Sequence, residues 1–134
     1  LSFHKGFIDI IEIWKKVNHS TGNRLGIIRD YDNQKGAKDK HDKLDDGKSI
    51  CVRTTSEYTL EPEIVKTGNN YSVLQNKYGD TFGWKGMSIE QMQQAWRDAK
   101  AADMLTICKD IASGELHEFQ MPKHIQEVLD FLKN

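Results

Sequence analysis

The sequence predicts an α/β fold with a small, mostly parallel sheet, flanking helices and a helical C-terminal part. The apolar run at residues 25–28 is expected to form a strand that is too short and too apolar to be an exposed edge, and residues 49–54 are a second strand candidate. An amphipathic helical pattern precedes the first run, and a helix followed by a buried strand favours α/β layering. Helical periodicity then dominates residues 88–134, the predicted helical C-terminal part.

The composition is that of an ordinary globular domain. With 134 residues, 37% apolar and 29% charged, the chain is expected to form one domain over residues 1–134. A net charge of -1 argues against a generally basic nucleic-acid binder, and no apolar stretch is long enough to cross a membrane. Cys51 and Cys108 match neither a disulfide framework nor a zinc-ligand spacing, so we expect reduced thiols and a cytoplasmic protein.

The N-terminal half begins with a helix and continues into the first strand. Apolar residues recur at helical spacing from Phe3 to Val17, and a loop containing Gly22 follows. After the strand at residues 25–28, residues 35–48 alternate lysine with aspartate and hold few apolar side chains. We therefore expect a charged, solvated and mobile loop over residues 35–48.

The second strand is followed by helical segments. Pro62 suits the first turn of a short helix, and glycines mark the ends of the later ones. The longest helical pattern of apolar residues begins at Ser88. The predicted helices after the second strand are residues 62–66, 71–78, 88–111 and 122–132.

Asp30 and Asp32 directly follow the first strand. Because positions i and i+2 of a strand project to the same side, the strand end could bring both carboxylates to one point. Two neighbouring carboxylates repel each other, and bound Mg²⁺ or Mn²⁺ removes that cost while using hard oxygen ligands. An ordinary Asp-Asn turn explains the same residues equally well.

Glu61 and Lys100 are further candidates. Glu61 lies just past the second strand, at the sheet edge where ligands bind in open α/β folds, but a carboxylate is also ordinary in a first helical turn. Lys100 borders the apolar stripe of the long helix, where it could lay its stem over the core or direct a cation at a phosphate. Sequence spacing alone favours the packing role for Lys100.

Three segments together resemble one family in the same order. They are Asp30-Tyr31-Asp32-Asn33 after the short strand, the run from Thr59 to Val65 that contains Leu-Glu-Pro, and residues 100–105. This pattern resembles the Toprim nuclease domain at the C-terminus of OLD-family (overcoming lysogenization defect) ATP-dependent endonucleases. The opening residues 1–5 also look like the start of the helix that precedes the aspartates there, so the resemblance covers most of the chain.

The resemblance implies a βα sheet whose carboxyl edge binds divalent metal and cleaves DNA phosphodiesters. Asp30 and Asp32 would be the Asp-x-Asp metal ligands, Glu61 a further acidic residue of the site, and Lys100 the cation that stabilises charge on the scissile phosphate. ATP would act only through a separate upstream ATPase domain of the ABC type, and a homo-oligomer is a further possible partner.

The chain differs from that family at its start. The family's glutamate motif at the end of the first Toprim strand has no match here and would precede Leu1, and no phosphate-binding loop of the Walker type is present. We therefore expect a truncated Toprim-like domain, catalytic in a longer parent chain and weak or inactive alone. The alternative is a non-catalytic interaction or dimerisation module on a degenerate Toprim scaffold.

Two other classes use aspartates in a related pattern, and both fit poorly. Phosphatases of the haloacid dehalogenase type place Thr or Val two residues after the second aspartate, where this chain has Gln34. A calcium loop of the EF-hand type would place glycine at Lys35 and a bidentate glutamate at His41.

Overall fold

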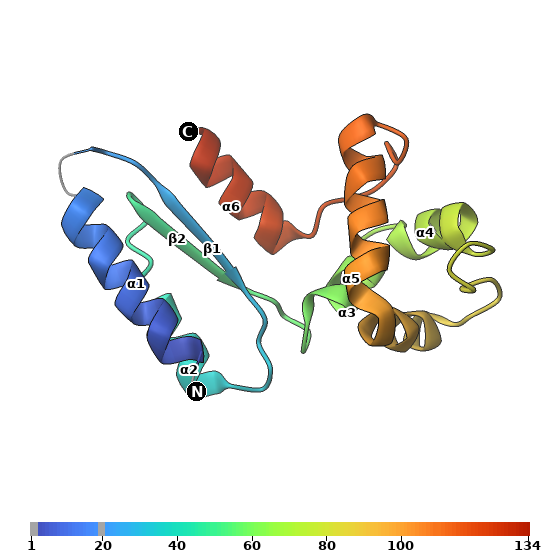
Figure 1. Cartoon of the computed structure of the whole chain (residues 1–134), viewed down its shortest axis with the longest axis horizontal. Helices are drawn as coiled ribbons and strands as arrows, with labels where there is room; N and C mark the ends of the chain where they lie inside the picture. The colour runs from blue at the N-terminus through green and yellow to red at the C-terminus, as the bar shows by residue number, and fades with distance from the viewer. Residues whose placement is uncertain (1–2, 19–20) are drawn as a thin grey trace. The chain divides into compact units, whose positions relative to one another are not determined.

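The computed structural model describes residues 3–18 and 21–134, except the side chains of residues 3–7, 100 and 101. The predicted α/β class is confirmed: helices accompany a parallel sheet that has two strands within the described residues (Figure 1). The chain divides into two compact units, unit 1 with residues 1–55 and 124–134, and unit 2 with residues 56–123. The sequence, interpreted as one domain, did not indicate this division.

Unit 1 is a three-layer arrangement of helix, sheet and helix. Its elements are listed in chain order: α1 (Phe3–Asn18), β1 (Leu25–Arg29), α2 (Lys35–Asp42), β2 (Ile50–Thr54) and α6 (Lys123–Lys133). The two strands pair in parallel, with Leu25 beside Ile50 and Arg29 beside Thr54. Figure 1 shows α1 and α6 on opposite sides of the strands. Both strand predictions are confirmed to within one residue at each end.

One face of the sheet packs against α1. Alternate strand residues, including Ile27, Ile50 and Val52, point to this face and form a core with Ile11 of α1. Trp14 of α1 packs against the same cluster. The helical spacing that predicts α1 therefore also identifies the stripe of the helix that is buried.

The other face of the sheet packs against α6, which approaches the backbone of β1 closely at Gly26. A Cβ atom added at Gly26 would overlap Val128 Cγ1 and lie 3.2 Å from Leu132 Cδ1. On the neighbouring strand, Arg53 forms an ion pair with Glu127 of α6. Glycine is required in β1 because α6 occupies the space that a side chain would fill.

Replacing Gly26 with alanine should destabilise unit 1. The added methyl group has to displace Val128 in a packed core, so we expect a loss of about 1–3 kcal/mol in the free energy of unfolding. Chemical denaturation followed by circular dichroism measures it. Gly36→Ala is the matched control, since a Cβ there meets no atom within 4 Å and should cost nothing. Equal stability of Gly26→Ala and the parent would contradict the packing described.

The outer edge of β2 is closed by the loop that precedes the strand. Asp46 Oδ1 accepts from Ile50 N at 2.9 Å, and Asp45 Oδ2 accepts from Val52 N at 2.8 Å. Arg53 Nη1 donates to Val52 O at 2.7 Å. Side chains thus satisfy backbone groups that would otherwise be open to another strand.

Asp46 also makes unit 1 sensitive to acid. A hydrogen bond from Ser49 Oγ at 2.5 Å, together with backbone N–H donors, holds the pKa of Asp46 well below its usual value of 3.8. Because the folded pKa is lowered, this contribution to stability is present above the unfolded value and is lost as the pH falls toward the folded one. We expect Asp46→Asn to lower the melting temperature at neutral pH and to flatten its decline below about pH 4. If the melting temperatures of both proteins fell equally with pH across this range, Asp46 would not be the source of the acid sensitivity.

The prediction of a loop over residues 35–48 is wrong for its first eight residues. Lys35–Asp42 forms α2, and His41 on this helix is buried, with Nδ1 2.7 Å from Ala37 O. Lys38 and Asp42 form an ion pair one helical turn apart. The alternation of lysine and aspartate therefore belongs to the exposed side of a helix.

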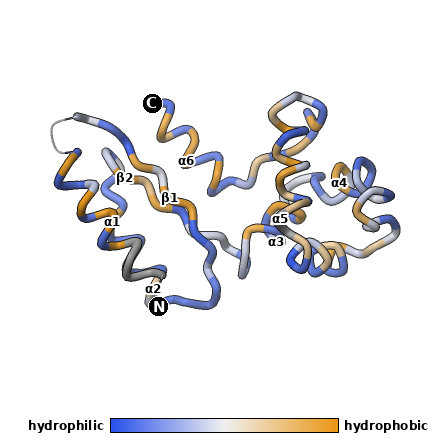
Figure 2. Tube along the Cα trace, in the orientation of Figure 1, coloured by the Kyte–Doolittle hydropathy of each residue, from blue (hydrophilic) through white to orange (hydrophobic). Residues whose placement is uncertain are grey.

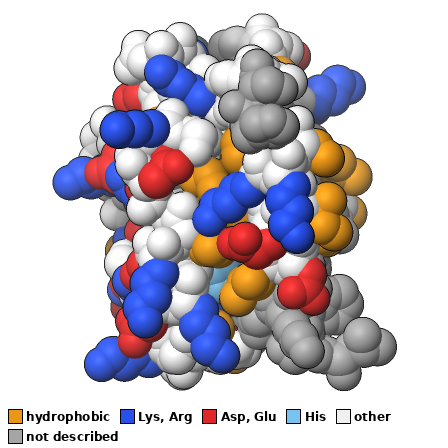
Figure 3. Space-filling model, turned by 90° about the vertical axis from the view of Figure 1, so that its left-hand side faces the viewer, with side chains coloured by type: hydrophobic (Ala, Val, Ile, Leu, Met, Phe, Trp, Pro, Cys, Tyr) orange, Lys and Arg blue, Asp and Glu red, His pale blue; other side chains and the backbone are white. Residues whose placement is uncertain are grey.

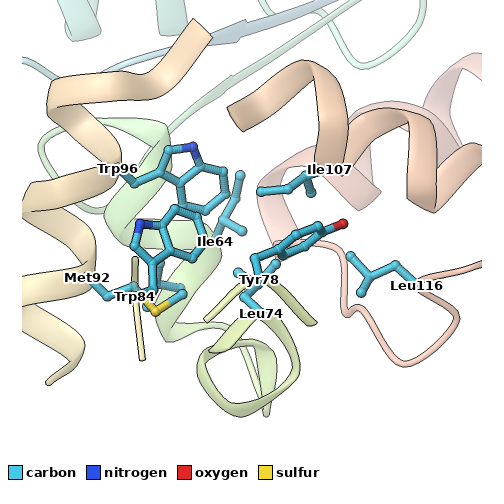
Figure 4. Packing of buried hydrophobic residues seen from close by; sticks show 9 residues of the cluster. Ile64, Leu74, Tyr78, Trp84, Met92, Trp96, Ile107 and Leu116 are labelled. Carbon is cyan, nitrogen blue, oxygen red and sulfur yellow. The ribbon is translucent and has the colours of Figure 1, made fainter. Parts of the chain in front are cut away.

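Unit 2 is helical in its described residues and has its own aromatic core. Its helices are α3 (Leu60–Lys66), α4 (Asn70–Tyr78) and α5 (Ile89–Ser113), which agree with the predicted segments. Figure 4 shows Trp84 and Trp96 packed beside Ile64, Leu74 and Tyr78. The two indole rings lie 5.5 Å apart between centroids.

The long helix α5 is capped at both ends and broken once. Ser88 Oγ accepts from Gln91 N at 3.2 Å in a capping box, and Gly114 ends the helix in the left-handed conformation. Ala99 has non-helical backbone angles, with φ -124° and ψ 21°, so two helical segments meet there. Lys100 is the first residue after this break.

Candidate metal centre

The loop after β1 is where the chain changes from hydrophobic to hydrophilic, as Figure 2 shows. β1 ends at Arg29, and Asp30 is the first residue past the strand. Asp32 and Asn33 both have positive φ, 49° and 54°, and Gln34 N donates to Tyr31 O at 2.9 Å. This is a tight turn with two left-handed residues, a conformation that aspartate and asparagine tolerate better than most residues.

The turn changes the argument for the aspartate pair. Strand alternation reaches Asp30 but not Asp32, because Asp32 lies inside the left-handed turn. The Asp-Asn turn that the sequence also allowed is therefore confirmed. Both carboxylates nevertheless follow directly on the strand, and both residues are half-buried.

Neighbouring β2 holds this loop in place. Thr55 N donates to Arg29 O at 3.0 Å, and Tyr31 N donates to Thr55 Oγ1 at 3.0 Å. Asp30 therefore lies between two residues that are each bonded to the end of β2. The sequence interpretation missed the role of Thr55, which could have been found as a hydroxyl residue at the matching end of the next parallel strand.

Glu61 is a buried carboxylate in the first turn of α3. It is 5% exposed, and its Oε2 atom has no hydrogen-bond partner among the described residues. Thr59 Oγ1 and Trp96 Nε1, also in unit 2, are likewise buried without a hydrogen-bond partner among the described residues. An ionised carboxylate without a partner is costly to bury, and a cation would remove that cost.

Glu63, in the same first turn of α3, is bonded to the loop before the helix. Glu63 Oε2 accepts from Ser56 N at 2.7 Å and from Glu57 N at 2.9 Å, while Oε1 accepts from Ser56 Oγ. These contacts tie the start of α3 to the loop before it. Oε2 of Glu61 has no such contact, and Glu61 also lies in the first turn, where a carboxylate favours the positive end of the helix.

The four predicted site residues are divided between the two units. Asp30 and Asp32 belong to unit 1, whereas Glu61 and Lys100 belong to unit 2. The side chain of Lys100 lies outside the described residues. Among the side chains that the structure describes, no group of three or more His, Cys, Asp or Glu residues is arranged to hold a metal ion.

The cysteines offer no alternative centre. Cys51 and Cys108 are both free thiols, and burial raises the pKa of the Cys51 thiol. Cys51 is accordingly an apolar side chain of β2.

Comparisons with known proteins give no relative. No protein-family model, no curated protein and no solved structure matches this chain. Across the described ranges, no helix is long and apolar enough to span a membrane.

Proposed function

We propose that this chain is a metal-dependent DNA endonuclease domain that cleaves phosphodiester bonds. The observation that carries the proposal is the position of Asp30 and Asp32, directly past the end of a parallel strand in a loop anchored to the neighbouring strand. The carboxyl edge of a parallel sheet is where α/β proteins bind ligands. Within unit 2, Glu61 Oε2 is buried without a hydrogen-bond partner, and such an oxygen is the kind of group that a cation satisfies.

The proposed residues have distinct roles. Asp30 and Asp32 of unit 1 would supply hard oxygen donors, which suit Mg²⁺ or Mn²⁺, and the resemblance assigns Glu61 as a further acidic ligand. Such a metal, when bound, activates water and neutralises charge on the phosphate. Lys100 would hold a positive charge near the departing oxygen. The DNA backbone is the proposed substrate, and an upstream ATPase domain of the ABC type in a longer parent chain is the proposed partner.

Titration with Mn²⁺ tests the metal site directly. Isothermal calorimetry on the whole chain should show binding, and Asp30→Asn should weaken it about tenfold, since asparagine keeps an oxygen ligand but loses the charge. Asp39→Asn is the matched control, because it removes the same charge from an exposed position on α2. Nicking of supercoiled plasmid in Mn²⁺ is expected to be weak for this chain and to fall further in Asp30→Asn. Equal affinity of the parent and Asp30→Asn would contradict the proposal.

The alternative function, a non-catalytic interaction or dimerisation module, has one observation in its favour. Large apolar side chains are exposed on α1 and α6, among them Ile13, Val17 and Leu132. A module of this kind would bind a partner without any need for metal.

A further inference from the structure

The outer edge of β1 is open. Leu25 N donates to Ser49 O at 2.8 Å and Arg29 O accepts from Thr55 N at 3.0 Å, so the odd-numbered residues of β1 face β2. In a parallel pair the residues between them direct their N–H and C=O groups to the opposite edge. Those residues are Gly26 and Ile28, and within the described ranges no hydrogen bond closes that edge. Ile28 is 42% exposed.

The side of α6 next to this edge is apolar. Leu132 approaches Gly26 of β1, whereas Glu127 pairs with Arg53 of β2. The side of α6 that carries Leu132 is therefore its β1 flank, and the side that carries Glu127 is its β2 flank. Leu129 lies three residues from Leu132 on the β1 flank and is also partly exposed. One face of the open edge is therefore bordered by leucines.

The side of α1 next to the same edge is apolar too. Asn18 Nδ2 donates to Asn23 O at 2.9 Å, so α1 ends beside the start of β1 and runs antiparallel to it. Residues 10, 13 and 17 lie about a quarter turn around α1 from its buried stripe. Because α1 runs antiparallel to β1, and because β1, α2 and β2 form a right-handed βαβ unit, this side of α1 is the one nearer to β1 than to β2. Ile10, Ile13 and Val17 are 61%, 59% and 68% exposed. Figure 3, which views the molecule from the α1 side, shows hydrophobic side chains at the surface among charged ones.

We propose that a second copy of this chain pairs with the first along β1. The two β1 strands would run antiparallel about a two-fold axis at Ile27, which makes one continuous four-stranded sheet. β1 is itself apolar on both faces, as a strand covered by helices on both sides must be. The same patch of both copies forms the contact, as a two-fold dimer requires.

This register is self-complementary. Gly26 lies opposite the partner's Ile28, and the two pairs exchange the open N–H and C=O groups of both strands. The partner's Ile28 side chain would lie on the α6 side of the sheet, next to Leu132, which approaches Gly26. Arg24 then lies opposite the partner's Asp30, a pair of opposite charges across strands. One nitrogen of Arg24 donates to Phe131 O at 2.7 Å, and the others remain available for a carboxylate.

The helices fit the same two-fold arrangement. The centres of the two strand pairs would be separated by two strand spacings, about 9.6 Å, which matches the usual distance of about 8–10 Å between packed helices. The α1 helices would meet antiparallel, with Ile13 near the axis and Ile10 beside the partner's Val17. The leucine flanks of α6 would meet on the other face. Both exposed apolar stripes would thus be buried together.

Light scattering on the whole chain tests the proposal. We expect a dimer of the 15.4 kDa chain at micromolar concentration. Ile28→Lys should raise the dissociation constant at least tenfold, because it places a charge at the edge and in the apolar contact. Leu105→Lys is the matched control: Leu105 is 74% exposed in unit 2, and this variant should remain a dimer. Circular dichroism checks that both variants are folded.

Disulfide trapping tests the register on a Cys108→Ser background. A mixture of Arg24→Cys and Asp30→Cys proteins should form a disulfide between copies, whereas each variant alone should not. If the unsubstituted chain is monomeric at all concentrations, the proposal is overturned. This holds even if the chain binds an apolar peptide along β1, because the occupant would then not be a second copy. Dimerisation of Ile28→Lys at the parental affinity, or cross-linking of Arg24→Cys alone, overturns it as well.

Discussion

Replacing Trp84 with alanine is expected to lower the free energy of unfolding of unit 2 by about 3–5 kcal/mol. The indole is 1% exposed and joins three other aromatic rings, at centroid distances of 4.9 Å to Phe82, 5.5 Å to Trp96 and 6.4 Å to Tyr78. Its removal leaves a cavity between α4 and α5 that these rings cannot fill without moving. Urea denaturation followed by far-ultraviolet circular dichroism measures the loss.

Two variants make the Trp84 prediction specific. Trp84→Phe keeps an aromatic ring at the site and should lose less stability than Trp84→Ala. Leu105→Ala removes apolar atoms from a side chain that is 74% exposed, so we expect a change within about 0.5 kcal/mol. If Trp84→Ala were no less stable than Leu105→Ala, the aromatic cluster would not be the core of unit 2.

Apart from α2, the elements of this fold could be predicted from local patterns, because each of them carries its own signal. The stripe of α1 has the period of a helix, and β1 and β2 are short apolar runs that end at polar residues. Ser88 and Gly114 mark the ends of α5 by the chemistry of helix caps. These signals depend only on neighbours along the chain, so they survive without knowledge of tertiary contacts.

Features that depend on distant residues could not be predicted in this way. The residues of α2 have the composition of a solvated loop. His41 on this helix is buried by contacts with the rest of unit 1, which the local sequence does not show. Gly26 reads as an ordinary strand residue until α6, a hundred positions later, is placed against it. The division into two units likewise depends on which helix covers which core.

The candidate site shows the same limit. Composition and spacing singled out Asp30, Asp32 and Glu61, but they could not distinguish Glu61 from Glu63 in the same helical turn. Only the structure shows that Glu63 binds the loop at Ser56 and Glu57, whereas Oε2 of Glu61 is buried without a partner. The left-handed turn at Asp32 could not be predicted either, because strand alternation assumes that Asp32 continues the extended backbone of β1.

Asp30 takes part in both proposals, and the two can be separated experimentally. Ile28→Lys acts on the β1 edge without removing a carboxylate, so it should weaken pairing at least tenfold and leave Mn²⁺ affinity unchanged. Asp39→Asn should change neither property. A loss of Mn²⁺ binding in Ile28→Lys would mean that the metal site needs both copies.

Replacing Asp32 with glycine is expected to weaken Mn²⁺ binding at least a hundredfold, about 2.7 kcal/mol, while the fold is kept. Glycine adopts the φ of 49° found at this position without strain, so the substitution removes the carboxylate and leaves the turn intact. The loss should exceed that of Asp30→Asn, because no oxygen ligand remains at the position.

Asn33→Gly supplies the matched control for Asp32→Gly, since Asn33 has a φ of 54° in the same turn but carries no charge. It should keep the Mn²⁺ affinity of the parent, and both glycine variants should melt at temperatures equal to or above that of the parent. Calorimetry with Mn²⁺ and thermal unfolding without it give the two readouts. Equal loss of affinity in both variants would assign the effect to the turn backbone, and unchanged affinity in Asp32→Gly would remove Asp32 from the metal site.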